Sequence, residues 1–584
     1  MRRRSRLVVV FAAVVAAVSP TAFARISHAA NVHTAAKGAS KPAVYLVGGG
    51  VESINPTPEM LAHNDFYLGG YGFGNGKIAN QNVPGVSDML GQRYAIGILG
   101  DGVHSRAFAV SDAKHTIVLG QIETQGYFAV YKQGPFGIVE IREDASAAIA
   151  KLAAAQKHAA PVPAASEILV DSNHSHGGPD TPGVWGGVPT SYLKLVHDRT
   201  VRAIVDAWQH MQKATLSYGV AHAGVEGETT KYPPTGGSDP VLTNQFSRDP
   251  NNQVMDDEIR VLQAHDLKTG TVLDTYVNYS SHPTVLGSSN RRVTADYTGR
   301  LNLAIEAAFG GFGMQQVATL GREQPARGGC PTIKGDQTNP DVALCTLDTY
   351  AARVLVKVKA AVATAKPLTG SAIAALNSYL LTDPATNPLL AGLVYGGSVI
   401  GVPAGRAGNP PWYTGNVIGT TYFVGRIGDV LFTGAPGEPY AQISQKVRDT
   451  VPGMLGYMNI GTAGDFLGYI IAPLEAYPEP IRRSLLSGDP PPAGDPACAA
   501  GGVSIGCPDP IGNDNYFFNV SHTFGERLTC DFLRGAGDIL MGDPMTYWSK
   551  YERCPLFAND FLLPPGFDTT FPQQPDLSAV MPHM

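Results

Sequence analysis

The stretch Ile168–Asp180, ILVDSNHSHGGPD, places two histidines one residue apart between an apolar run and a Gly-Gly-Pro turn. The β-branched apolar run predicts a buried strand that ends at Asp171. Residues i and i+2 of an extended segment project from the same face, so we expect His174 and His176 to point together into a cleft at the strand end. Such a pair suits a metal ion or a proton relay, and it also occurs as a purely structural cluster of loop histidines.

Strand patterns alternate with helical patterns along most of the chain. Strands are expected at 106–112, 115–124, 215–223, 258–266, 271–282 and 315–320, and helices at 144–159, 191–214, 297–309, 346–365 and 438–449. This alternation predicts an α/β fold in which a mixed sheet is flanked by helices. No boundary divides residues 43–480, so a single large domain is expected over residues 43–530.

The first thirty residues have the pattern of an export segment. MRRRSR is a basic n-region, LVVVFAAVVAAV is an apolar h-region, and AFA (22–24) or SHA (27–29) is a small-residue cleavage site. The h-region is too short to span a bilayer comfortably, which favours a cleaved signal peptide over an uncleaved anchor. Residues 1–30 are therefore predicted to be removed by the general secretory route, residues 31–42 to form a flexible N-terminus, and the mature protein to be secreted.

Composition excludes some classes of partner. Charged residues make up 16% of the 584 residues, and the formal net charge is −6. No basic run follows the N-terminus, which argues against nucleic-acid binding, and no second segment has the length and apolar character of a transmembrane helix.

The six cysteines form three local pairs, and in an oxidising compartment this spacing predicts three disulfides, sequential pairing being the simplest of fifteen connectivities. The pairs are Cys330/Cys345, Cys498/Cys507 and Cys530/Cys554. The second pair closes a Pro/Gly-rich stretch, 488–514, that we expect to be a surface insertion. No Cys-x-x-Cys pair is present, so a thiolate zinc site is not expected.

Three further apolar strands are followed by polar clusters, which contain His282, Glu438, and Asp465 with Tyr469. Active sites of α/β folds gather at the C-terminal ends of strands. Two imidazoles, a carboxylate and a phenol form a donor set of the kind that binds Zn²⁺ with an open position for water or substrate. The alternatives are a histidine satisfied within its loop, Glu438 as the dipole partner of the helix 438–449, and Tyr469 as a core residue.

Four segments occur in the order of four motifs of the neutral (non-lysosomal) ceramidase family. They are NHSHGGP (173–179), SHPT (281–284), APGEPYAQISQKVRD (435–449) and GDFLGYIIAPLEAY (464–477), and NVSHTFGERL (519–528) is similar to a fifth. The chain resembles this family from about Gly70 to Leu528. The family consists of zinc amidases that cleave the N-acyl bond of ceramide, so the resemblance implies a ceramidase-like catalytic domain over residues 43–530 and a Zn²⁺ cofactor.

Position by position, the resemblance assigns zinc ligands and substrate contacts. The implied zinc ligands are His174, His282, Glu438 and Tyr469. His176 matches the second histidine of the first motif and is a candidate proton donor or substrate contact. Asp296 matches an aspartate of the family's SSDNxG stretch, and Arg248 in NQFSRDP matches the arginine of its NRSP segment.

The chain departs from the family at the active-site serine. The family's GDxSPN segment is replaced here by TLGREQPARGG (319–329), with Gln324 at the serine position and Arg322 at the aspartate position. Glutamine is not a nucleophile, so either metal-activated water attacks directly or the serine's role is lost. Gln324 is a candidate for orienting that water or holding the substrate carbonyl, and Glu323 is a candidate general base.

A second departure lies at the C-terminus. Family members carry a β-sandwich domain there, which needs roughly a hundred residues. Only about fifty residues follow Leu528, and residues 531–584 are therefore expected to form a surface strap.

We thus predict a secreted zinc-dependent hydrolase that cleaves an N-acyl amide bond of ceramide or a related lipid, presented at a membrane surface. Two alternatives stay open: a zinc hydrolase for another amide or an ester, and a non-catalytic ceramidase-like binding protein. The replacement of the serine by Gln324 favours the binding protein, whereas the retention of all four implied zinc ligands counts against it.

Overall fold

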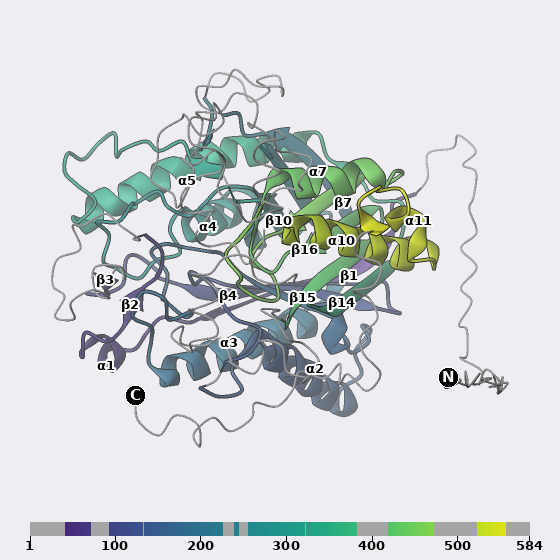
Figure 1. The fold of residues 1–584 in the computed structure, drawn as a ribbon, viewed down its shortest axis with the longest axis horizontal. Coiled ribbons are helices and arrows are strands. Elements are labelled where there is room, and N and C mark those ends of the chain that lie inside the picture. Colours follow the sequence, from purple (N-terminus) through teal and green to yellow (C-terminus); the bar gives the residue numbers. More distant parts are fainter. Residues whose placement is uncertain are drawn as a thin grey trace, which may run out of the picture. The chain divides into compact units, whose positions relative to one another are not determined.

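A nine-stranded mixed sheet lies at the centre of the fold in the computed structural model (Figure 1). The structure describes residues 41–71, 93–131, 133–225, 239–244, 255–321, 323–381, 419–471 and 523–555. The strands run in the order β11-β10-β9-β7-β1-β4-β5-β6, and β13 pairs with β7. Their bounds are β1 (Val44–Ser53), β4 (His104–Ser111), β5 (Thr116–Ile122), β6 (Ile168–Ser172), β7 (Gln212–His222), β9 (Glu258–Asp266), β10 (Val272–Tyr279), β11 (Phe312–Val317) and β13 (Lys366–Pro367). The pairs β5/β6 and β10/β11 are parallel, and the others are antiparallel.

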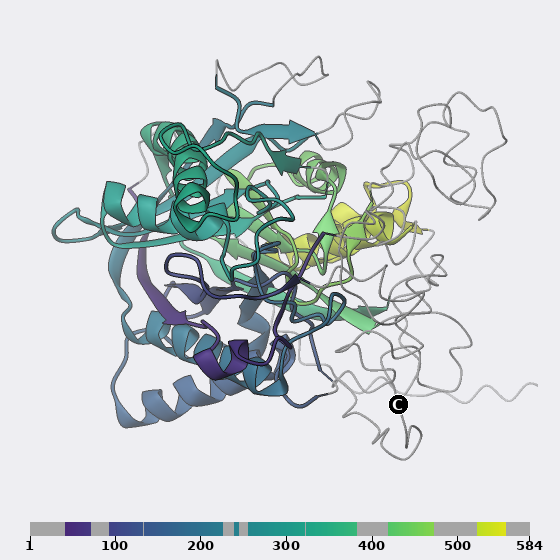
Figure 2. The same ribbon diagram turned by 90° about the vertical axis from the view of Figure 1, so that its left-hand side faces the viewer.

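Helices cover one face of this sheet. α2 (Ile138–Ala155) and α3 (Thr190–Gln209) lie at the β1, β4 and β5 end, and α4 (Tyr297–Phe309) and α5 (Pro340–Ala363) lie over β7, β9 and β10 (Figures 1 and 2). Helix α3 comes very close to β1 at Gly48 and Gly50. A Cβ atom at these positions would lie 2.4 Å from the carbonyl oxygen of Ala207 and 2.1 Å from that of Ala203. Only glycine permits this approach of helix to strand.

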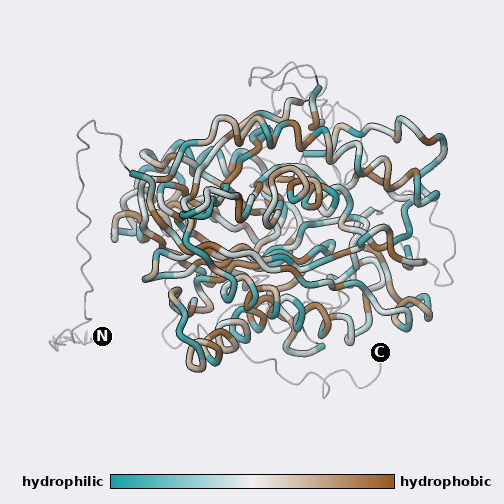
Figure 3. Tube along the Cα trace, turned by 180° about the vertical axis from the view of Figure 1, so that it is seen from behind, coloured by the Kyte–Doolittle hydropathy of each residue, from teal (hydrophilic) through white to brown (hydrophobic). Residues whose placement is uncertain are grey.

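The other face packs against a second sheet, β14-β15-β16-β18. The sequence did not predict a separate sheet, although β16 and β18 are the apolar strands expected before Glu438 and before Asp465. Its strands are β14 (Ile373–Leu381), β15 (Gly419–Ile427), β16 (Val430–Gly434) and β18 (Gly456–Ile460). Alternate residues separate the two faces of the large sheet: Val261 packs with the residues of α4 and α5, and Leu262 packs with those of the second sheet. Hydrophobic segments accordingly run along the strands in the middle of the protein (brown in Figure 3).

The outer face of the second sheet packs against α10 (Phe524–Met541), which contacts α7 (Ala441–Thr450) and α11 (Met545–Trp548). The described residues thus form four layers in the order helix, sheet, sheet, helix. The remaining elements are short: α1 (Pro58–Leu61), η1 (Ala165–Glu167), and the two-stranded pairs β2 (Tyr67–Leu68) with β3 (Arg93–Tyr94), β8 (Leu242–Asn244) with β12 (Glu323–Pro325), and β17 (Glu438–Pro439) with β19 (Tyr469–Ile470).

The prediction of a mixed sheet flanked by helices is confirmed. The strand 258–266 and the helix 297–309 have the predicted bounds. The predicted helix 346–365 begins earlier, at Pro340, because the Asn339 side chain caps it by accepting from the backbone N–H groups of Asp341 and Val342. The predicted helix 191–214 ends at Gln209, since β7 already begins at Gln212.

The placement of Glu438 at the start of a helix is wrong. Glu438 lies in β17, and α7 begins three residues later, at Ala441. The backbone N–H of Glu438 donates to the carbonyl of Gly468, and that of Tyr440 donates to Ile470. These long-range hydrogen bonds keep the chain extended through Pro439.

Two of the three predicted disulfides are confirmed, Cys330–Cys345 and Cys530–Cys554. Several predicted features lie outside the described residues. They are the third cysteine pair, Cys498/Cys507, with its insertion 488–514, the export segment 1–30, nearly all of residues 31–42, and the part of the predicted strap beyond residue 555. Within the described part of the chain, no helix combines the length and apolar character needed to cross a bilayer.

A buried carboxyl group couples stability to pH. Asp171, at the end of β6, accepts hydrogen bonds from the side-chain amides of Gln121 (3.2 Å) and Gln316 (2.5 Å). Burial raises the pKa of Asp171 to about 8, although the two amides oppose this shift. Between about pH 4 and pH 8 the folded protein therefore retains a proton that the unfolded chain has released, so the contribution of Asp171 to stability decreases as the pH rises through this range.

We expect Asp171→Asn to flatten this decrease, by up to about 1.4 kcal/mol per pH unit, because asparagine does not titrate. The amide of Gln121, whose Oε1 has no hydrogen-bond partner among the described residues, can rotate to accept from the new side chain. Chemical denaturation at about pH 5 and pH 8 measures the change in the free energy of unfolding. The exposed Asp266→Asn is the control, and an unchanged pH slope in the Asp171 variant would contradict the prediction.

Candidate active site

Segments that follow strands of both sheets meet at one point. His174 lies two residues after β6 and His282 three residues after β10, while Glu438 and Tyr469 are neighbours in the parallel pair β17/β19. The two sheets are joined here, because the backbone N–H of Ser172 donates to the carbonyl of Thr462 and the Thr462 hydroxyl donates to the carbonyl of Ser172. The site thus lies at the C-terminal ends of strands, as expected for an α/β fold.

Four side chains converge there with short distances between their donor atoms. His174 Nε2 lies 3.2 Å from His176 Nε2 and 3.4 Å from Glu438 Oε2, and His282 Nε2 lies 3.1 Å from the same carboxylate oxygen. One nitrogen of each histidine lies within 4.8 Å of the other two. His174, His282 and Glu438 are buried and His176 is partly buried.

Backbone carbonyls fix the tautomers of two of these histidines. His174 Nδ1 lies 2.7 Å from the carbonyl oxygen of Gln125, and His282 Nδ1 lies 2.9 Å from that of Glu323. A carbonyl only accepts, so Nδ1 carries the proton in both rings. In the neutral imidazoles each Nε2 then presents a lone pair, and both lone pairs point toward the Glu438 carboxylate.

This donor set fits a divalent metal ion. Lone pairs and a carboxylate that face one another repel unless a cation or additional protons lie between them. Metal–ligand distances of about 2.0–2.2 Å in a tetrahedral site place donor atoms about 3.3–3.6 Å apart, close to the separations observed. A hydrogen bond from each Nδ1–H to a carbonyl is also the usual way in which proteins orient metal-binding histidines.

Electrostatics argue against the alternative, in which protonated imidazoles form ion pairs with Glu438. Burial lowers the pKa of His174 to about 4, although the Glu438 carboxylate opposes this shift. Burial and the neighbouring His174 and His282 also hold the pKa of His176 well below its usual value. For Glu438, burial opposes ionisation, yet the nearby histidines and a hydrogen bond from Tyr469 bring its pKa below the usual value. At neutral pH the His174 imidazole is therefore neutral beside an ionised Glu438 carboxylate.

The backbone of the first motif differs from the expected extended geometry. His174 has a φ of 62°, in the left-handed region that non-glycine residues rarely adopt. The rings of His174 and His176 converge because the chain turns at His174, and not because residues i and i+2 share a strand face. Strain of this kind concentrates at functional sites.

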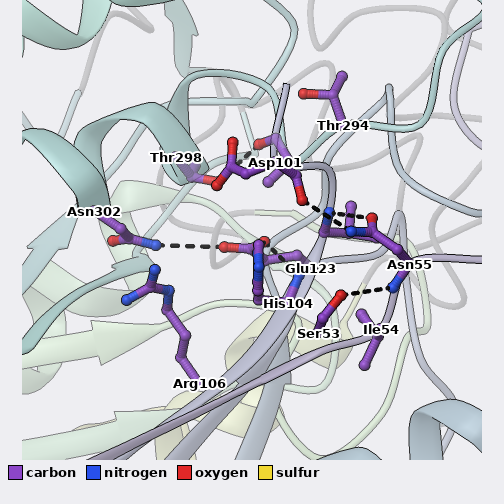
Figure 4. A network of polar contacts seen from close by, with 12 residues as sticks. Ser53, Ile54, Asn55, Asp101, His104, Arg106, Glu123, Thr294, Thr298 and Asn302 are labelled. Carbon is purple, nitrogen blue, oxygen red and sulfur yellow. Dashed lines mark hydrogen bonds and ion pairs between the residues drawn. The ribbon is translucent and has the colours of Figure 1, made fainter. Parts of the chain in front are cut away.

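Buried polar groups hold this turn in place. The Asn173 amide donates to Thr298 Oγ1 (2.8 Å), and the Ser175 hydroxyl donates to the carbonyl of Thr294 (2.8 Å). The network continues to Glu123, which accepts from the Asn302 amide and from the backbone N–H of His104 (Figure 4). The loop and helix α4 are thereby fixed relative to β4 and β5.

The remaining predicted site residues surround this cluster or support it. The Tyr469 hydroxyl bonds to the Glu438 carboxylate. Asp465 is buried and accepts from the backbone N–H of Ala129 and from the Thr420 hydroxyl. Asp296 caps α4 and accepts backbone N–H groups on both sides of the loop 285–297, which gives it a structural position.

The segment that contains Glu323 and Gln324 lies against the site. Gln324 Oε1 accepts a hydrogen bond from the Thr284 hydroxyl at 2.6 Å, two residues after His282. The Glu323 carboxylate accepts from the backbone N–H of Asp256, while its carbonyl orients His282. Arg322 and Arg248 lie outside the described residues.

Sequence reasoning missed several residues next to His176. Tyr71 packs edge-on against the His176 ring, with centroids 4.7 Å apart, and its hydroxyl donates to the carbonyl of Thr284. Arg93 donates to the carbonyl of His176 at 2.6 Å. The backbone carbonyls of Gln125 and Glu323 as acceptors for the two histidines were missed as well, because the residue type does not indicate which group a backbone carbonyl accepts from.

Fold and site together define an α/β protein with a buried histidine–carboxylate cluster suited to a metal ion. No protein-family model and no curated protein sequence matches the chain. Among solved structures, the chain is similar to neutral ceramidase from Pseudomonas aeruginosa, with a TM-score of 0.51, 15% sequence identity, and coverage of 75% of this chain and 70% of that one. A ceramidase structure described as complexed with C2 has a TM-score of 0.55 and 15% identity, with coverage of 85% and 75%. The protein therefore has a ceramidase-like fold.

We expect protein purified without chelator to contain close to one equivalent of zinc per chain, and His174→Ala to contain less than about half an equivalent, because one imidazole ligand is lost. Elemental analysis measures both. His115→Ala is the matched control, since this exposed histidine lies outside the cluster and pairs with Glu167. Wild-type protein with less than about half an equivalent would exclude a resident zinc ion.

Proposed function

We propose that the protein is a secreted zinc-dependent hydrolase that cleaves an N-acyl amide bond of ceramide or a related lipid. The observation that carries this proposal is the convergence of His174, His282 and Glu438 on one buried point, with Nδ1 of each imidazole bonded to a backbone carbonyl. The ceramidase-like fold supports the choice of an amide substrate. Export is proposed from the pattern of residues 1–30.

In this proposal His174, His282, Glu438 and Tyr469 hold the ion. A bound zinc ion supplies Lewis acidity for the scissile carbonyl and lowers the pKa of water to about 7. The carbonyls of Gln125 and Glu323 keep both imidazoles in the ligating tautomer and orientation. Burial excludes bulk water from the ligands, which strengthens each electrostatic interaction at the site.

His176 is the proposed carrier of a proton from the attacking water to the leaving amine, because its neutral ring takes up a proton before it gives one. Its Nε2 lies 3.2 Å from His174 Nε2, and its partial exposure gives it access to substrate. Tyr71 packs against its ring and restricts the ring's orientation. An amide nitrogen leaves only after it has been protonated, so a donor at this place is required for C–N cleavage.

Gln324 is proposed to bind the substrate carbonyl or the attacking water in place of a nucleophile. Thr284 donates to Gln324 Oε1, which orients the side-chain amide, and the nitrogen of this amide only donates. Glu323 is proposed as a positioning residue, because its carbonyl holds His282 and its carboxylate accepts from the backbone of Asp256. Arg248 stays a predicted substrate contact outside the described residues.

A second candidate function is a non-catalytic ceramidase-like binding protein. The residue that favours it is Gln324, which lacks the nucleophilic hydroxyl of the family. A metal hydrolase for another amide or an ester is the remaining alternative. A panel of N-acyl and ester lipids, incubated with and without chelator, separates these three: a binding protein hydrolyses none of them.

We expect chelator-sensitive hydrolysis of N-acyl lipids by the wild-type protein and loss of hydrolysis in His174→Ala with the circular dichroism spectrum unchanged.

Gln324→Ala is expected to lower kcat by about 10²-fold, the usual effect of removing one donor to a developing oxyanion. Gln324→Glu, which keeps the size but places a negative charge beside the carbonyl, should lower kcat at least as much. Full activity of His174→Ala would refute the metal's role, and full activity of Gln324→Ala would refute the role given to the amide.

A further inference from the structure

Four arginines that border one loop have no carboxylate partner among the described residues. Eight arginines elsewhere form ion pairs with carboxylates: Arg106, Arg199, Arg202, Arg260, Arg300, Arg353, Arg448 and Arg553. In contrast, Arg93, Arg291, Arg292 and Arg327 form no ion pair with a carboxylate of the described residues. All four lie on or against the loop 287–293, which follows His282.

Three of these arginines bond to backbone carbonyls. Arg93 donates to Asn290 (3.0 Å), Arg291 donates to Tyr94 (3.3 Å), and Arg292 donates to Thr338 (2.9 Å). Arg327 is exposed and bonds to no carbonyl of the described residues, and its Nη1 lies 3.8 Å from the position of a Cβ atom on Gly287. Carbonyl partners do not neutralise the guanidinium charges. Asp180 acts on Arg93 and Asp296 acts on Arg327 without an ion pair, so the loop keeps part of its positive potential.

This positive region adjoins His176. Arg93 is buried, donates to the His176 carbonyl, and has its guanidinium 4.9 Å from the Tyr71 ring, which packs on His176. Burial lowers the pKa of Arg93 only to about 10, so it is a charged group at neutral pH. Arg327 reaches the same place through Gly287, whose backbone N–H donates to the Thr284 carbonyl that also accepts from the Tyr71 hydroxyl.

The nearest carboxylates are engaged elsewhere. Asp296 accepts from the backbone N–H groups of Val285, Leu286 and Tyr297. Asp180 accepts from four backbone N–H groups, those of Gly183, Val184, Trp185 and Gly187. Burial raises the pKa of both carboxyl groups, that of Asp180 to about 6, while the charge of Arg327 opposes this shift at Asp296. Neither directs its oxygens to an arginine of the loop.

We infer that the substrate carries an acidic group (a carboxylate, sulfate or phosphate) on the amine side of the scissile amide bond, and that Arg327 binds this group. The inference rests on the proposed function, which places the leaving amine beside His176. An N-acyl amino acid has this geometry, because its carboxylate is two bonds from the amide nitrogen. Its hydrolysis breaks the C–N bond, adds the oxygen of water to the acyl carbon, and yields a fatty-acid carboxylate and a zwitterionic amino acid with the two protons of water on nitrogen.

Arg327 is the specificity-determining residue in this proposal, and Arg93 is a positioning residue. The guanidinium of Arg93 donates to carbonyls of Gly70, His176 and Asn290 and holds the first motif, whereas that of Arg327 is exposed beside the site. A planar guanidinium binds a carboxylate through two parallel hydrogen bonds, which gives both affinity and orientation.

Equilibrium binding to metal-stripped protein tests the inference without any need for catalysis. The probes are N-dodecanoylglycine, N-dodecanoyltaurine and the methyl ester of N-dodecanoylglycine, which has the same chain without the charge. We expect both acids to bind wild-type protein at least about tenfold more tightly than the ester, a difference of about 1.4 kcal/mol. Arg327→Ala should abolish this preference and leave ester binding unchanged, and Arg327→Lys should retain part of it. Arg202→Ala, an exposed arginine paired with Glu52, is the matched control and should behave as wild type.

Equal binding of acid and ester by the wild-type protein would overturn the inference, as would an Arg327→Ala variant that keeps the preference. Binding of phosphatidylserine vesicles without binding of the soluble acids would also overturn it and would assign the arginines to a membrane surface. Hydrolysis is measured separately with the same probes and added zinc. A charge preference that depends on Arg327, together with no hydrolysis of any probe, supports the acidic-ligand inference and refutes the proposed hydrolase.

Discussion

Two hydrogen bonds, from His174 Nδ1 to the carbonyl of Gln125 and from His282 Nδ1 to that of Glu323, determine the chemistry of the site. Each bond leaves an Nε2 lone pair directed at Glu438. Both acceptors are backbone atoms, so the strands β5 and β12, near which they lie, set the protonation of the imidazoles. The fold thereby selects a cluster that repels itself when empty and is stabilised by a cation.

The sequence predicted the parts of the structure that depend on local pattern. Apolar runs indicated the strands before His174 and His282, and helical periodicity gave the bounds of α4. Glu438 was placed wrongly because β17 contains only two residues and exists through its pairing with Tyr469 and Ile470, far along the chain. The positive φ of His174 could not be predicted either, since few histidines adopt the left-handed region.

The loop arginines and Gln324 describe a site that differs from the family's pattern at the reacting end of the substrate. Gln324 is held by Thr284 where the family has a serine, and Arg327 follows three residues later on the same segment. In the proposed function a single segment, 319–329, therefore carries both the residue at the serine position and the arginine that binds the acidic group. A change in the reaction and a change in substrate preference would then be linked, because both lie on one short segment.

The ligating groups are spread over His174 to Tyr469, and the hydrogen bonds between Ser172 and Thr462 join the two sheets beneath them. A nascent chain that lacks the second sheet also lacks Glu438 and Tyr469, so its set of proposed ligands is incomplete. In the proposed function, capture of the ion is a final event of maturation, because the proposed ligands come together only when the two sheets dock. If the protein is exported as proposed, the cations of the compartment where it finishes folding, and not those of the compartment where it is synthesised, determine which metal it acquires.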